Sequence, residues 1–175
     1  HTVYHLFRRS RPDIGVTVDV QQSSFVLEGL RQGKLDLAVI VGASEVRGFI
    51  TEPLLPSYGI PVGLPGHRLA GSSPAPFREL AREQLVLPGS AHFFRGVLSQ
   101  MAAEAGISLN VVLEVTNIEA QVHAVLEGLG ITIMSTHCVA NEGAAGHLCP
   151  LRVQGFPIRT EWFIVHPPGQ LSPSA

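Results

Sequence analysis

The chain has 175 residues, of which 45% are hydrophobic and 15% charged, a composition that predicts a folded protein and excludes a disordered one. Twelve basic residues against fourteen acidic ones give a formal charge of −2, without the basic surface typical of a nucleic-acid-binding module. Two cysteines are too few for a disulfide framework, and no apolar run approaches the roughly 20 residues that span a bilayer. Early arginines are atypical of a signal peptide, so a cytoplasmic protein is expected.

The first quarter of the chain predicts alternating strands and helices. Apolar residues alternate over residues 14–20, which predicts a strand. Ser23 and Ser24 are candidates to cap a helix over residues 23–32. Residues 37–41 form a continuous apolar run, typical of a strand buried on both faces. With a helix between them, the two strands are expected to pair in parallel through a right-handed crossover.

The stretch from Gly48 to Pro65 has a different character, because four prolines interrupt its short apolar runs. Proline cannot donate a hydrogen bond to a neighbouring strand, so this density of prolines argues against one long central strand. The stretch therefore predicts a crossover between two lobes.

The second half returns to regular units of strand and helix. Strands are expected over residues 85–87, 109–115, 129–134, 151–153 and 162–165, and helices over residues 77–83, 93–105 and 118–127. Thr116 and Glu119, three residues apart at the start of the last helix, match a capping-box pattern.

Three segments, in order along the chain, carry a family resemblance. Residues 30–38 read Leu-Arg-Gln-Gly-Lys-Leu-Asp-Leu-Ala, in which Gly33 ends a helix before the next strand. Residues 67–70 read His-Arg-Leu-Ala, and residues 125–131 read Val-Leu-Glu-Gly-Leu-Gly-Ile. The chain resembles the effector-binding domain of LysR-type transcriptional regulators. It departs from the family by an arginine in the second segment and by Ser135, because the family usually has proline at both places.

The resemblance implies the α/β fold of type 2 periplasmic binding proteins, with two lobes joined by two crossovers around a ligand cleft. Lobe one would comprise residues 1–59 and 137–175, and lobe two residues 60–136. The helix-turn-helix that binds DNA in this family is absent from these residues, so DNA contact is expected only through a separate N-terminal domain.

The family domain opens with a strand before its first helix, whereas apolar spacing here predicts that helix already at residues 3–7. Without the central strand, two rows of backbone groups would lose their hydrogen-bond partners. We expect residues upstream of His1 to complete the sheet in the natural protein. Strand addition by a partner chain is the alternative.

Polar residues at three helix starts are the candidate ligand contacts. In open α/β sheets ligands bind beyond the carboxyl ends of the strands, and free N–H groups at a helix N-terminus attract anions. The alternative is that each polar residue only caps its helix. The expected effector contacts are Ser23, Ser24, Ser90, His92, Phe93, Thr116, Asn117 and Ser135.

These observations favour a sensor domain that binds a small, anionic metabolite and forms a homodimer or tetramer, without membrane contact. The dimer would place the helix over residues 23–32 against the helix over residues 93–105 of the partner. A solute-binding protein for transport is the alternative. No motif of an enzyme occurs, and no cofactor or metal is expected, because His137, Cys138, His147 and Cys149 lack zinc-site spacing.

Overall fold

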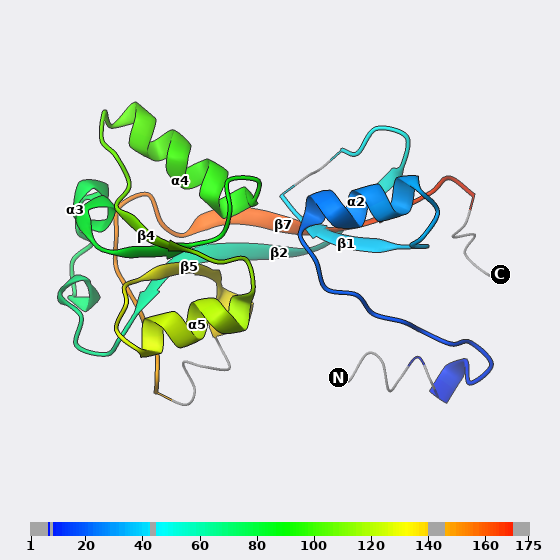
Figure 1. Ribbon diagram of the computed structural model, residues 1–175, viewed down its shortest axis with the longest axis horizontal. Coiled ribbons are helices and arrows are strands. Elements are labelled where there is room, and N and C mark those ends of the chain that lie inside the picture. The colour runs from blue at the N-terminus through cyan, green and yellow to red at the C-terminus, as the bar shows by residue number, and fades with distance from the viewer. Residues whose placement is uncertain (1–6, 8, 43–44, 140–145, 170–175) are drawn as a thin grey trace.

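The protein folds into two α/β lobes joined by two long strands (Figure 1), as the predicted fold class requires. The computed structural model describes residues 7, 9–42, 45–139 and 146–169. In chain order the elements are α2 (Ser23–Arg31), β1 (Ala38–Val41), β2 (Ile50–Gly63), the 3-10 helix η1 (Arg68–Ala70), α3 (Phe77–Arg82), β3 (Leu85–Leu87), α4 (Phe93–Glu104), β4 (Val111–Glu114), α5 (Ile118–Leu126), β5 (Thr132–Ser135), β6 (Cys149–Pro150) and β7 (Ile158–His166).

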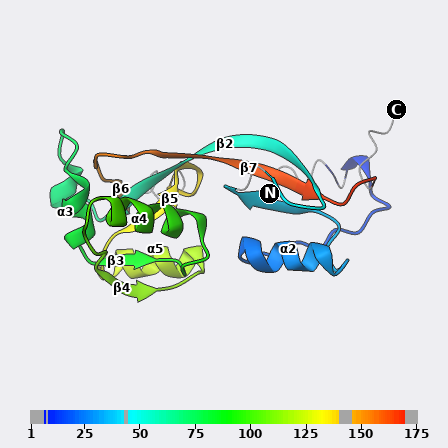
Figure 2. The same ribbon diagram turned by 90° about the horizontal axis from the view of Figure 1, so that it is seen from above.

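The two joining strands are β2 and β7, which run side by side between the lobes (Figure 2). They pair antiparallel from Ile50 opposite His166 to Gly59 opposite Ile158. The prediction that prolines exclude a long strand here was wrong, since β2 has 14 residues. Pro53 falls at a register shift, and over residues 50–58 the described strands pair with only one edge of β2. A proline whose missing N–H points to the open edge breaks no ladder bond.

The first lobe is built from α2, β1 and the adjoining ends of β2 and β7. The apolar side of α2 packs on β1, where Leu30, Ile40 and Val165 are buried together. Gly33 follows α2 in the left-handed region, with φ of 64°, as the sequence predicted. The opposite face of β1 is open, because Val39 is 45% exposed. The expectation of burial on both faces was therefore wrong within the part of the chain that the structure describes.

Residues 14–20 do not form the predicted strand. Val16, Val18 and Val20 are exposed by 41%, 74% and 90%, and no described segment pairs with their backbone. Alternation gives a segment a strand-like pattern, but a strand persists only when a neighbour completes its hydrogen bonds. The predicted parallel pairing fails for the same reason, and β1 instead pairs antiparallel with β7. The helix expected at residues 3–7 lies outside the described residues except for Phe7.

The second lobe places β3, β4 and β5 between α4 and α5, which lie on opposite sides in Figure 1. β3 and β4 pair in parallel, from Leu85 opposite Val111 to Leu87 opposite Glu114. The predicted strand over residues 151–153 is displaced to β6, while Val153 forms a bridge with Ala75. The main core of this lobe includes the buried residues Leu69, Leu80, Leu85, Leu87, Phe94, Leu98, Ile131, Ile133 and Leu151.

The boundary between the lobes stays a prediction. Val139 and Leu148 pack with Val62, Val125 and Met134 of the second lobe. This packing favours a second boundary near the start of β7, later than residue 137. Among the described residues, no helix combines the length and apolar character that crossing a membrane requires.

Candidate effector-binding cleft

The lobes meet where β1 ends and α4 begins. Gly42 follows β1 with φ of 83°, and a Cβ atom there would lie 2.2 Å from Cδ2 of Phe93. The Phe93 ring, in the first turn of α4, therefore reaches across to the first lobe. Nearby, a Cβ atom on Gly89 would lie 3.3 Å from Oε1 of Glu114 and 4.0 Å from Nε2 of Gln22. Groups from both lobes thus come close together where the family resemblance places the ligand cleft.

The N-terminus of α2 opens into this region without a side-chain cap. Its N-cap residue is Gln22, whose side chain accepts no capping hydrogen bond. The predicted capping by Ser23 and Ser24 was wrong, because the helix begins at Ser23 and both serines lie inside its first turn. The first backbone N–H groups of α2 consequently have no acceptor within the helix. Ser23 is half-buried and Ser24 is exposed.

The N-terminus of α4 is capped by His92. Its Nδ1 atom accepts a hydrogen bond from the backbone N–H of Phe94 at 3.3 Å. Ser90 is exposed and is not the cap residue of this helix. Burial lowers the pKa of His92 below its usual value of 6.5, since the charged imidazolium is less well solvated there. A neutral His92 suits its role as acceptor.

The third predicted helix start is closed by a different residue from the one expected. Asn117 Oδ1 accepts a hydrogen bond from the N–H of Ala120 at 2.9 Å. The capping box between Thr116 and Glu119 was wrong because α5 begins at Ile118, one position too late for Thr116 to cap it. Thr116 is exposed. This helix start is already satisfied and offers a ligand less than α2 does.

Ser135 lies at the end of β5, opposite Gly59 of β2. It is buried, and its Oγ accepts a hydrogen bond from the N–H of Cys138 at 3.4 Å. A Cβ atom on Gly59 would lie 2.4 Å from Cε1 of Phe94, so this face of the sheet lies against the start of α4. The structure thus gathers His92, Phe93 and Ser135 around one helix start.

Arg95 is a further residue of this region, which the sequence alone did not indicate. It lies in the first turn of α4, and its Nε and Nη1 atoms are buried without a hydrogen-bond partner among the described residues. Nη1 lies 3.7 Å from Oε2 of Glu114, within ion-pair range but too far for a hydrogen bond. A cation in the first turn opposes the helix dipole, and this local conflict was the available signal.

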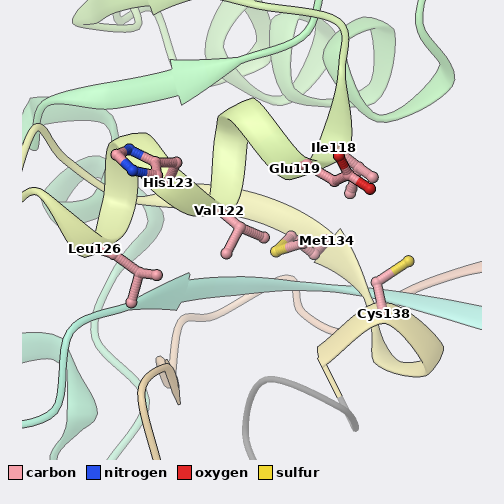
Figure 3. Close-up of a pocket in the computed structure, with 7 residues that line it drawn as sticks. All are labelled: Ile118, Glu119, Val122, His123, Leu126, Met134 and Cys138. Carbon is pink, nitrogen blue, oxygen red and sulfur yellow. The ribbon is translucent and has the colours of Figure 1, made fainter.

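A surface cavity of about 370 Å³ lies elsewhere, against α5 (Figure 3). It is lined by Ile118, Glu119, Val122, His123, Leu126, Met134 and Cys138. None of the eight predicted contacts lines it, although Ser135 hydrogen-bonds the lining residue Cys138. Within the described ranges, no group of three or more His, Cys, Asp or Glu side chains is placed to hold a metal ion.

Two α/β lobes, with two helix starts near their meeting point and the partly buried cation Arg95 on one of them, are features of a small-molecule-binding domain. A family model described as the LysR substrate binding domain matches residues 3–175, and the chain belongs to this family. The Synechocystis CcmR regulatory domain, solved in complex with 2-PG, superposes with a TM-score of 0.87 at 25% identity, covering 98% of this chain and 83% of that one. The effector-binding domain of QuiR in complex with shikimate shares the fold, with a TM-score of 0.80 at 18% identity over 98% of this chain and 82% of that one.

Curated relatives agree with this assignment. A RuBisCO operon transcriptional regulator of Allochromatium vinosum is 29% identical over 97% of this chain and 57% of its own length. The HTH-type transcriptional activator CmpR of Synechocystis is 28% identical over 91% of this chain and 53% of its own length. The chain therefore spans about half the length of these relatives. Both are named as regulators, so the transport alternative is not favoured.

The lowered pKa of His92 predicts a pH dependence of folding. Between 6.5 and the lower native pKa, the unfolded chain binds a proton that the native protein does not. The His92 contribution to stability is therefore fully present above pH 6.5 and is lost as the pH falls toward the native pKa. We expect His92→Asn, which keeps a cap acceptor, to lose less stability than wild type between about pH 7.5 and about pH 5.5 in urea unfolding. Equal losses in both proteins would contradict this.

Proposed function

We propose that this domain senses a small anion in the cleft between its lobes and thereby modulates DNA binding by a longer, cytoplasmic regulator. DNA contact belongs to a separate domain, and the chain is not an enzyme. The observation that supports an anionic ligand is at Arg95. Its Nε and Nη1 atoms are buried and have no hydrogen-bond acceptor among the described residues. The anion shifts the population of lobe arrangements toward the arrangement that it binds more tightly.

Two further features support an anionic ligand. The start of α2 lacks a side-chain cap, so its N–H groups and the positive end of its dipole face the cleft region. The closest cleft carboxylate, that of Glu114, has a side chain that is 58% exposed and offsets the Arg95 charge only weakly. The 2-PG bound to the similar CcmR domain agrees with this class of ligand.

A thermal-shift screen tests the proposal with matched pairs of small carboxylates or phosphate esters and their neutral amides or alcohols. A specific anion at 100 times its dissociation constant should stabilise the domain by about 2.7 kcal/mol, whereas its neutral partner should not. Calorimetry should then give one site per chain. Binding of neutral or cationic compounds alone would refute the anionic class.

Serine substitutions at the two helix starts separate ligand contact from folding. We expect Ser23→Ala and Ser90→Ala to weaken binding of an anion found in the screen. A lost helix cap lowers the free energy of unfolding by about 1 kcal/mol. Neither serine caps its helix, so each variant should lose less stability than that. Calorimetry and urea unfolding measure the two effects. Unchanged affinity in both variants would remove these serines from the site.

The proposal includes self-association through α2 and α4. Phe25 on α2 is 64% exposed and is the clearest apolar contact available for a partner. Phe93 and Val97, which are apolar residues of α4, instead pack partly against the core of their own lobe. Because an isologous dimer repeats each contact twice, Phe25→Glu should shift a dimer strongly toward monomer in sedimentation. Val112→Glu, at an exposed residue on β4, is the control that should leave the dimer intact. A wild-type monomer at high micromolar concentration would contradict the pairing.

A further inference from the structure

Two buried hydroxyl groups lie side by side on the strands that join the lobes. Ser57 on β2 is 0% exposed and Thr160 on β7 is 8% exposed, and the two residues are register partners. Directly opposed residues of an antiparallel pair project from the same face of the sheet. Neither Oγ of Ser57 nor Oγ1 of Thr160 has a hydrogen-bond partner among the described residues.

The sheet position of this pair directs it toward the cleft. Gly59 lies two residues beyond Ser57, and alternate residues of a strand share a face. A Cβ atom on Gly59 would lie 2.4 Å from Cε1 of Phe94. The hydroxyl pair therefore faces the side of the sheet on which the first turn of α4 packs. The same turn carries Phe93 and Arg95.

Unpartnered hydroxyls are unusual at this depth, because most buried polar groups find a partner. The buried Thr132 follows that rule, since its Oγ1 donates to Oε1 of Gln121 at 3.1 Å. Ser57 and Thr160 are register partners, yet their hydroxyls do not bond each other. Two neighbouring buried hydroxyls thus lack a hydrogen-bond partner within the part of the chain that the structure describes.

We propose that Ser57 and Thr160 form a subsite that holds an oxygen of the effector. The inference rests on the proposed function and narrows it. Arg95 offers only hydrogen-bond donors, in the first turn of α4, and the two hydroxyls offer donors on the joining strands. A ligand that satisfies both places carries oxygen acceptors at two ends, as a dicarboxylate or a phosphorylated carboxylic acid does. Contact with both joining strands would also couple the ligand to the segments that any lobe movement must bend.

The test uses Ser57→Ala and Thr160→Val, singly and together, with succinate, phosphoglycolate and inorganic phosphate as probes in calorimetry. Each substitution should lower affinity for a two-ended probe about 3- to 10-fold, the worth of one hydrogen bond. Because the hydroxyls are unpartnered in the free protein, the melting temperature without ligand should stay equal or rise. Affinity for inorganic phosphate, which reaches one end only, should not change.

Thr51→Val is the matched control. Thr51 Oγ1 is likewise buried without a partner and lies on β2, but it is six residues from Ser57, about 20 Å along the strand. Its loss should leave affinity for all three probes unchanged.

The outcomes separate the two proposals. If wild type binds a two-ended probe and the Ser57 and Thr160 variants bind it equally well, the subsite is refuted and anion sensing stands. A lower melting temperature of the free variants would make the hydroxyls structural and also refute the subsite. An equal loss for inorganic phosphate would refute the two-ended ligand. If wild type binds inorganic phosphate but neither two-ended probe, the subsite is refuted and anion sensing stands.

Discussion

Gly130→Ala is expected to lower the free energy of unfolding by about 3 kcal/mol, the upper range for overpacking a closed site. A Cβ atom on Gly130 would lie 2.2 Å from the backbone oxygen of Gln84 and 2.8 Å from its carbonyl carbon. That oxygen also accepts the N–H of Ile131 at 2.9 Å, and Leu85 is fully buried beside it. Neither backbone segment can move aside without breaking the contact between β3 and the start of β5.

Gly96→Ala is the control for the added methyl group. Gly96 lies within α4, and a Cβ atom there would meet nothing within 4 Å. Alanine is favoured over glycine in a helix by about 1 kcal/mol, so this variant should be more stable than wild type. Urea unfolding of both variants measures the contrast. A loss below about 1 kcal/mol in Gly130→Ala would show that the Gln84 backbone relaxes easily.

The sequence predicted those elements whose signals are local. Glycines at 33, 106 and 128 have positive φ and follow α2, α4 and α5, where helical spacing ended in the sequence. The apolar runs at β1, β3 and β7 also appeared as strands. In each case the residues themselves dictate a turn or a buried extended segment, whatever their partner.

Two strand predictions failed because pairing is not local. Residues 14–20 alternate as a strand should, yet the described chain supplies no neighbour for them. β2 contains prolines and still forms a long strand, since β7 supplies a partner more than 90 residues away in the sequence. Whether a strand forms depends on its partner, which local patterns do not specify.

The meeting point of the lobes was predicted better than the residues that cap its helices. The starts of α2 and α4 lie at the meeting of the lobes, as the order of strands and helices implied. Two capping predictions were misplaced by one or two positions, because Gln22 and Asn117 occupy the N-cap positions that Ser23 or Ser24 and Thr116 were expected to fill. A helix boundary shifted by one residue exchanges a cap for a first-turn residue. Arg95, Ser57 and Thr160 could be recognised only from burial and missing partners, which are properties of the folded chain.

Arg95→Gln should have the largest effect on ligand binding. If the anion accepts hydrogen bonds from Nε and Nη1, the substitution removes a charge-assisted contact worth about 1.5–3 kcal/mol. Anion affinity should then fall about 10- to 100-fold. Folding should be nearly unaffected, because Nε and Nη1 donate no hydrogen bond to any described residue and the ion pair with the exposed Glu114 is loose.

Three further variants sharpen this prediction. Glu114→Gln removes the carboxylate that competes for Nη1 at 3.7 Å, so anion affinity should rise. Arg95→Lys keeps the charge but loses the planar pair of donors, and it should recover only part of the affinity. Arg82→Gln removes an exposed arginine of the same lobe that pairs with Glu79 at 3.3 Å, and calorimetry should show wild-type binding. Wild-type affinity in Arg95→Gln would mean that the anion binds without this side chain, and the helix starts alone would then have to hold its charge.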